Sequence, residues 1–178
     1  SGFICSRLNK QERALGKRSV FNVVREAVSD SIYDRLLSVG RLDEDTTGLL
    51  LLTTDGHIVH DIASPDKHVE KTYAVQLDRE LQPNDMDALS KGLTIDLEVN
   101  GDVAPFTTAP AKVSIDEQGL VSLTISEGKK RQVRRMFSAL DYTVERLHRV
   151  SIGGLRLEMF VVKAGEAVEI EETLLRQL

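Results

Sequence analysis

The pattern of apolar and polar residues predicts short strands in four parts of the chain. Strict alternation is clearest over residues 121–125, where valine, leucine and isoleucine alternate with serine and threonine. Residues 73–77 alternate in the same way and predict a half-buried strand, and residues 3–5 read as part of another. The continuously apolar run 49–53 predicts a buried strand, which the Asp55-Gly56 turn signal ends.

Other apolar residues recur at helical spacing. The segments that show it are 20–28, 58–63, 84–91 and 133–140. Ser19 is the expected cap of the first, Pro65 stops the second, and the third lies between Pro83 and Gly92. Strands mixed irregularly with helices, without an internal repeat, favour an α+β fold built on a mostly antiparallel sheet flanked by helices.

Length and composition favour one domain with a substantial core. The chain has 178 residues, of which 41% are apolar and 29% charged. We expect two lobes within it, at about residues 1–70 and 71–178. The sequence shows neither a secretory leader nor a membrane-spanning run, so we expect a soluble cytoplasmic protein. The single cysteine, Cys5, cannot form an internal disulfide and is poor evidence for zinc.

Charge is unevenly distributed along the chain. The net charge of −5 argues against nucleic acid as a partner, but the average hides two basic segments, at 7–25 and 129–149. The acidic residues concentrate at 78–102 and 166–172. If the basic segments meet in space they form a positive face, whereas solvated helix faces would explain the same runs without any ligand.

The segment GRLDEDTTGLLLLTTDG, residues 40–56, places Asp43 just before a run of leucines. A carboxylate at the edge of an apolar element is costly and commonly has a chemical role. Asp43, Asp45 and Thr47 are spaced like calcium ligands, but the twelfth position of such a loop is Thr54 rather than glutamate. Asp43 and Asp45 could also be the acids of a glycosidase, although the chain has no tryptophan to stack on a sugar.

Four separate motifs resemble one family. Gly40-Arg41-Leu42-Asp43, followed by Thr47-Gly48-Leu49-Leu50, is similar to the catalytic motif of RNA pseudouridine synthases that modify single ribosomal RNA uridines. The later motifs follow in the family's order, and they are Lys71-Thr72-Tyr73, Glu127 to Phe137, and Leu147-His148-Arg149 with Ile152-Gly153-Gly154. Their details are most similar to the small-subunit (16S) enzymes. The resemblance implies the pseudouridine synthase fold, with its active-site cleft between two lobes.

The resemblance also implies roles for individual residues. Asp43 would be the essential acid or nucleophile, Arg134 its ion-pair partner, and Tyr73 the ring that packs on the target base. Arg41 would hold the space vacated by a flipped uridine. Further RNA contacts are expected from Lys129, Lys130, Arg131, Arg135 and Arg149. The implied reaction converts uridine to pseudouridine and needs neither a cofactor nor a metal.

Other targets and roles remain open, and the N-terminus of the chain departs from the family's pattern. The target could be large-subunit (23S) RNA, or the chain could be a noncatalytic RNA-binding or ribosome-assembly factor with the same fold. We expect a monomer that acts on ribosomal RNA or on a subunit assembly intermediate. Gly2 to Ser6 align after the Leu-Asn-Lys-Pro stretch that opens this domain in the family. We therefore expect residues 1–178 to be a catalytic domain truncated at its N-terminus and lacking the small upstream RNA-binding domain.

Overall fold

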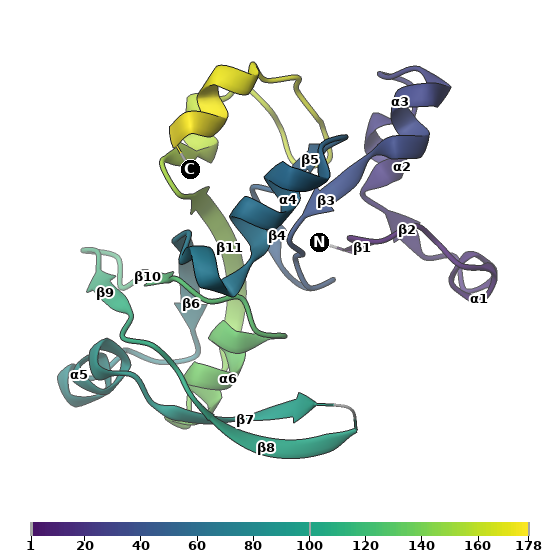
Figure 1. The fold of residues 1–178 in the computed structure, drawn as a ribbon. Coiled ribbons are helices and arrows are strands. Elements are labelled where there is room, and N and C mark those ends of the chain that lie inside the picture. The colour runs from purple at the N-terminus through teal and green to yellow at the C-terminus, as the bar shows by residue number, and fades with distance from the viewer. Residues whose placement is uncertain (1, 100, 178) are drawn as a thin grey trace.

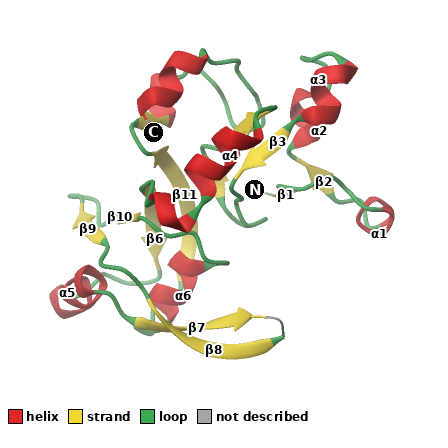
Figure 2. Ribbon diagram, viewed as in Figure 1, coloured by secondary structure: helices red, strands yellow, loops and turns green. Residues whose placement is uncertain are grey.

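The computed structural model describes residues 2–99 and 101–177, and Figures 1 and 2 show the arrangement of its elements. The helices are α1 (Lys10–Ala14), α2 (Phe21–Val24), α3 (Asp30–Arg35), α4 (Gly56–Ala63), α5 (Pro83–Lys91) and α6 (Gln132–Ser138). The strands are β1 (Phe3–Ile4), β2 (Arg18–Ser19), β3 (Leu37–Val39), β4 (Thr47–Gly48), β5 (Leu51–Thr53), β6 (Lys71–Leu77), β7 (Thr94–Val99), β8 (Asp102–Thr107), β9 (Lys112–Ile115), β10 (Val121–Ile125), β11 (Val144–Ile152) and β12 (Leu155–Arg156). Short 3₁₀ turns occupy Pro65–Lys67, Leu157–Met159 and Glu172–Gln177.

The largest sheet has the strand order β12-β11-β6-β10-β9, and every neighbouring pair in this order is antiparallel. A further short strand, β4, pairs in parallel with β11. Helices lie beside this sheet, as Figure 2 shows. The predicted α+β class and the mostly antiparallel sheet are therefore confirmed.

The alternation that predicted β6 and β10 also explains how the two strands pack. Val75 pairs with Val121 and Tyr73 with Leu123, so these side chains share one face of the sheet. Val75 and Leu123 are fully buried in the same apolar cluster as Met136 and Phe137 of α6. The apolar stripe of α6 therefore covers this face of the sheet.

The leucine run 49–53 does not form the single strand that its sequence predicts. β4 ends at Gly48 and pairs with β11, whereas β5 begins at Leu51 and pairs with β3. Leu49 and Leu51 are both buried, in a second apolar cluster with Ile62 and Ile152. Because the two short strands join different sheets, the backbone must break its extended course between them.

Three predicted helices are confirmed as α4, α5 and α6. The Asp55-Gly56 signal marks the start of α4, because Asp55 Oδ1 accepts a hydrogen bond from His57 N at 2.8 Å. The third helix begins with Pro83 and ends before Gly92, as predicted. α6 ends at Ser138, so Leu140 lies beyond the helix.

The helix expected over residues 20–28 is much shorter. The N-cap residue of α2 is Val20 and not the predicted Ser19, although Ser19 Oγ accepts a hydrogen bond from Phe21 N at 3.2 Å, and α2 stops at Val24. Ser29 then adopts an extended backbone and its Oγ accepts from Ile32 N, which starts α3. A capping serine at position 29 thus divides the apolar stretch into two helices.

The hairpin of β7 and β8 lies next to α6, running crosswise below it in Figure 1, and forms a sheet of its own. Ile95 and Leu97 of β7 are buried in the main apolar cluster, while the residues between and after them are acidic. In the second apolar cluster, Ile62 packs with Ile152 across the lobe boundary expected near residue 70. The division into two lobes stays a prediction.

Candidate active site

Asp43 lies in a segment that connects β3 to β4, and we call residues 41–49 the Asp43 loop. The Asp43 side chain is half-buried, and its main-chain oxygen accepts a hydrogen bond from Thr46 N at 2.9 Å. This bond closes a tight turn that begins at Asp43. The structure therefore holds the backbone at Asp43 without using its carboxylate.

The end of the Asp43 loop is joined to β11. His148 pairs with Thr47 and Arg149 with Gly48 in the parallel register, and Thr47 Oγ1 lies 2.7 Å from His148 Nδ1. Burial, and secondarily the charge of Arg146, lowers the pKa of His148 below its ordinary value. A neutral imidazole is thereby favoured beside Thr47.

Arg134 reaches the Asp43 loop, but it binds Asp45 rather than Asp43. Its Nη2 lies 3.2 Å from Asp45 Oδ2 and donates to Asp45 O at 3.0 Å, while Nη1 donates to Val144 O at 2.8 Å. Among the described residues, no ion pair joins Arg134 to Asp43. The ion pair expected between Arg134 and Asp43 is thus replaced by one between Arg134 and Asp45. The hydrogen bond to Val144 O on β11 anchors the guanidinium where Asp45 is within reach.

Asp45 also binds Arg131, at the start of α6. The two side chains form a bidentate pair, with distances of 3.3 Å and 3.1 Å between their nitrogen and oxygen atoms. The Asp45 and Arg131 side chains are 47% and 42% exposed, whereas Arg134 is 14% exposed. The Asp45 carboxylate therefore binds two arginines at the Asp43 loop. Arg134 is mostly buried, and Arg131 lies at the surface.

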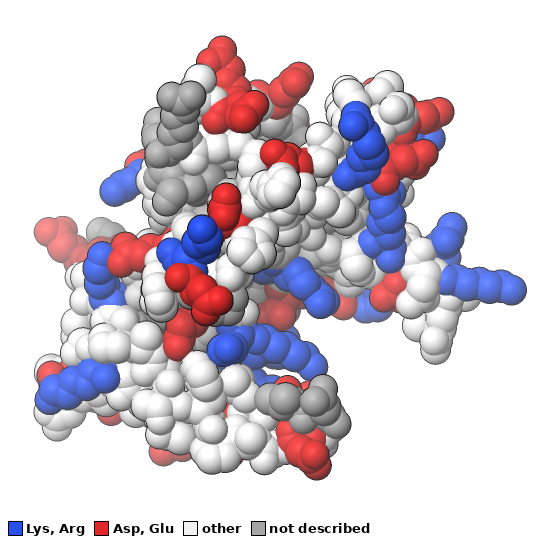
Figure 3. Space-filling model, viewed as in Figure 1, with Lys and Arg blue, Asp and Glu red and all other residues white. Residues whose placement is uncertain are grey.

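The other predicted RNA contacts near α6 lie against the β7–β8 hairpin. Lys130 forms an ion pair with Glu98 at 3.3 Å, and Lys129 Nζ lies 5.0 Å from the centre of the Phe106 ring. Arg135 donates to the main chain of β7. In Figure 3, lysine and arginine side chains gather above this hairpin, with acidic side chains among them. RNA binding by these residues stays a prediction.

Tyr73 lies in the middle of the main sheet, at a point that connects it to the Asp43 loop. It pairs with Leu123 of β10 on one side and with Arg149 of β11 on the other. Its side chain is half-buried against the main apolar cluster. The strand register thus brings the predicted base platform next to the residue that contacts both ends of the loop.

Arg149 is not placed to bind RNA, contrary to the sequence-based expectation. It is 3% exposed, and its Nε and Nη1 donate to Leu49 O at 2.8 Å and to Arg41 O at 3.4 Å. On β11 it shares a face with the buried Leu147, which explains why the strand carries it inward. Its contacts are with the main chain of the Asp43 loop.

Arg41 differs from Arg149 in having an exposed side chain. In the part of the chain that the structure describes, it forms no ion pair with Asp43 or Asp45. The surface salt bridge that could have explained Arg41 without RNA is therefore not formed. Its predicted place at the mouth of a uridine pocket stays a prediction.

Lys71 is a buried cation that the sequence motif contained but to which we assigned no role. It is 8% exposed, and its Nζ donates to Ile62 O at 3.2 Å. Burial, and then the positive charge of Arg149, lower the pKa of Lys71 from 10.5 to about 8. The signal was its position in β6, where Lys71, Tyr73 and Val75 alternate on one face of the strand.

The lowered pKa of Lys71 predicts a rise in stability with pH. Between pH 8 and 10.5 the unfolded chain keeps a proton that the folded chain has released, so the free energy of unfolding increases. In urea denaturation, the advantage of Lys71→Met over the wild type should be greatest below about pH 8 and shrink toward about pH 10. The difference for Lys91→Met, an exposed lysine of α5, should stay constant. A constant difference for Lys71→Met would contradict the prediction.

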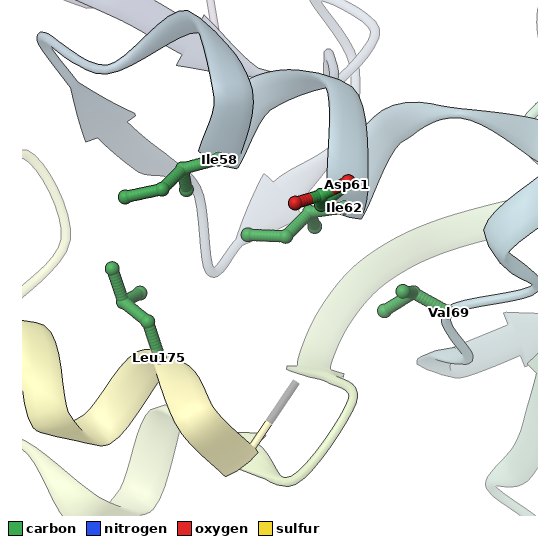
Figure 4. Close-up of a pocket in the computed structure, with 5 residues that line it drawn as sticks. All are labelled: Ile58, Asp61, Ile62, Val69 and Leu175. Atoms are coloured by element: carbon green, nitrogen blue, oxygen red, sulfur yellow. The ribbon is translucent and has the colours of Figure 1, made fainter.

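The structure also contains a cavity of about 170 Å³. Its lining is mostly apolar and consists of Ile58, Asp61, Ile62, Val69 and Leu175. Figure 4 shows Ile58 and Leu175 pointing toward one another across it. None of the predicted site residues lines this cavity, so it is not the candidate active site.

Two features are absent from the part of the chain that the structure describes. No helix among them is long and apolar enough to cross a membrane. Nor do residues 2–99 and 101–177 contain three or more histidine, cysteine or acidic side chains arranged to hold a metal ion.

Comparisons with known proteins agree on one family. Residues 2–139 match the sequence model described as RNA pseudouridylate synthase. The chain is 47% identical over 124 residues to the ribosomal small subunit pseudouridine synthase A of Haemophilus influenzae, and 42% identical over 124 residues to that of Escherichia coli K12. Each match covers 70% of this chain and 51% of the relative, so the chain spans about half their length. A solved structure titled "Crystal structure of pseudouridylate synthase" has a TM-score of 0.81 and 36% identity, covering 99% of this chain and 69% of that one.

Proposed function

Because the chain belongs to the RNA pseudouridylate synthase family, we propose that it converts uridine to pseudouridine in ribosomal RNA, with small-subunit RNA as its target. The family predicted from the four motifs is confirmed by the match over residues 2–139. The small-subunit target is supported by the names of relatives that are 41–47% identical. We propose a ribosomal RNA or a subunit assembly intermediate as the partner of a cytoplasmic monomer.

The observation that carries the proposal is the convergence of distant motifs on the Asp43 loop. Arg134 contacts Asp45 from 89 residues away in the sequence, and Arg149 contacts Leu49 from 100 residues away. Tyr73 pairs with Arg149 on the neighbouring strand. Arg134 and Arg149 thus contact the loop that carries the half-buried Asp43, and Tyr73 lies one strand away from it.

The proposed reaction fits such a site. Forming pseudouridine breaks the bond between the ribose and a base nitrogen and rejoins the ribose to a base carbon, without net oxidation. We propose that Asp43 is the nucleophile or essential acid of this exchange, and that the Tyr73 ring holds the uracil by stacking, which contributes about 1–3 kcal/mol per base. Arg134 would act from its place at Asp45, by adding positive charge beside the loop and fixing its backbone.

RNA contacts are proposed for the exposed or half-exposed cations around the loop. They are Arg41, Lys129, Lys130, Arg131 and Arg135. A long cation at position 41 could fill the space left by a flipped uridine. The contacts of Lys130 and Arg135 with the hairpin orient these side chains before RNA arrives.

Tritium release provides the test of the proposed function. Small-subunit ribosomal RNA labelled with tritium at carbon 5 of uracil should release its label into water when the new carbon–carbon bond forms. Large-subunit RNA labelled in the same way should release little. Release from large-subunit RNA alone would reassign the target, and binding of both RNAs without release would indicate a noncatalytic factor.

Asp45→Asn should strengthen RNA binding. The change removes a negative charge and leaves Arg131 available to phosphate, so we expect about 5-fold tighter binding at low ionic strength. The gain should shrink as salt screens the surface. Fluorescence anisotropy with labelled RNA measures it.

Glu44→Gln is the matched control for Asp45→Asn. It removes the same charge one residue away, from a side chain that pairs with Lys17 at 2.7 Å. Equal effects of the two changes would mean that overall charge, and not the arginines held by Asp45, controls RNA affinity.

A further inference from the structure

The guanidinium of Arg149 connects the two ends of the Asp43 loop. Its Nε lies 2.8 Å from Leu49 O, and its Nη1 lies 3.4 Å from Arg41 O. A guanidinium is planar and presents its donors in a fixed geometry. One rigid group therefore sets the separation of the two carbonyls between which Asp43 lies.

The main chain of Arg149 also holds the C-terminal end of the Asp43 loop. Arg149 O accepts a hydrogen bond from Leu49 N at 2.8 Å, so the two residues exchange contacts through both main chain and side chain. Gly48 packs directly against the Arg149 backbone, in the parallel register of β4 and β11. The C-terminal end of the loop is therefore attached to β11 of the main sheet, and Arg149 makes the contacts with Gly48 and Leu49.

Arg149 is a costly residue to bury at this place. It is 3% exposed, its Nη2 is a buried donor without a partner, and no ion pair joins it to an acid among the described residues. The neighbouring Lys71 is also buried and positively charged below its pKa. An unpaired buried cation lowers stability, and an apolar side chain of similar size would avoid that cost. Packing alone therefore does not explain why this position carries an arginine.

We propose that Arg149 is a positioning residue, which holds the Asp43 loop in the conformation needed for turnover. The inference rests on the proposed function, since it assigns Asp43 to the reaction. Arg149 touches the main chain of the loop and acts on the reaction through the place it gives to the Asp43 carboxylate. RNA binding, which depends on exposed cations, should not depend on it.

Arg149→Lys is the test variant, because lysine keeps the charge but cannot bridge both carbonyls. We expect kcat for tritium release to fall about 100-fold, the loss typical of a misplacement of about 1 Å, with KM for RNA changed by less than about 2-fold. Arg146→Lys is the matched control, since Arg146 is exposed on the same strand. It should leave both constants unchanged.

Amide hydrogen exchange measures the loop without any assay of activity. In Arg149→Lys, the amides of Thr46 and Leu49 should exchange at least about 10-fold faster, while that of Leu123 in the core stays as slow as in the wild type. Unchanged exchange in the loop would overturn the proposal. Faster exchange with unchanged kcat would overturn the link between loop order and turnover.

Two further results separate failure of this proposal from failure of the proposed function. A wild-type chain that releases no tritium would refute the function, and exchange alone would then decide whether Arg149 orders the loop. If Arg149→Lys does not fold, amide hydrogen exchange in the wild-type chain tests the proposal instead. Thr46 and Leu49 should be protected as strongly as β11, and independent opening of the loop would overturn the proposal.

Discussion

Asp43→Asn should reduce pseudouridine formation by at least about 10⁴-fold, the loss expected when an essential group of a reaction is removed. Asparagine matches aspartate in shape but carries no charge, so it cannot serve as a nucleophile or accept a proton in the same way. The turn at this position uses the main-chain oxygen of Asp43, which bonds Thr46 N at 2.9 Å and is retained in the variant. Folding and RNA binding should therefore survive the change.

Tritium release and RNA anisotropy, measured on the same preparations, test this expectation. Glu44→Gln is the control, because it removes a neighbouring carboxylate that is exposed and paired with Lys17. Its turnover should stay within about 2-fold of the wild type, as expected for a surface carboxylate that binds Lys17 and has no role in the reaction. Turnover by Asp43→Asn close to that of the control would refute the assignment of Asp43.

Much of the fold could be predicted from local pattern. Alternation over 73–77 and 121–125 gave two paired strands of the main sheet, and helical spacing gave α4, α5 and α6. The β7–β8 hairpin was missed, although Ile95 and Leu97 alternate with acids in a recognisable strand pattern. The acids of this segment dominate its composition and hide the period of two in its apolar residues.

Predicting the site was harder, because burial depends on tertiary contacts. The motif around Arg149 suggested an RNA contact, but the parallel pairing of β4 with β11 places this residue beneath the loop. Sequence could not distinguish Asp43 from Asp45 as the partner of Arg134, since two acids two residues apart lie on the same loop. The choice depends on where Val144 anchors the arginine, and that contact is not visible in a local pattern.

Gly48→Ala should be the most destabilising small substitution near the site. Gly48 has φ of +110°, and a Cβ added there would lie 2.2 Å from Arg149 O. An alanine would thus be strained in its backbone and would clash with main-chain atoms that cannot move without breaking the β4–β11 pairing. We expect the free energy of unfolding to fall by about 2–4 kcal/mol. Urea denaturation measures this change.

Two other glycines separate the causes of this loss. Gly56 begins α4 with an ordinary backbone and open space around it, so Gly56→Ala should be neutral or stabilise by up to about 1 kcal/mol. Gly40 has φ of +69° but also open space, so Gly40→Ala should show the backbone strain alone, about 1 kcal/mol. The excess loss in Gly48→Ala over Gly40→Ala then measures the close approach to Arg149. Equal losses would mean that the loop can move away from β11, and a loop that moves so easily could not hold Asp43 in place.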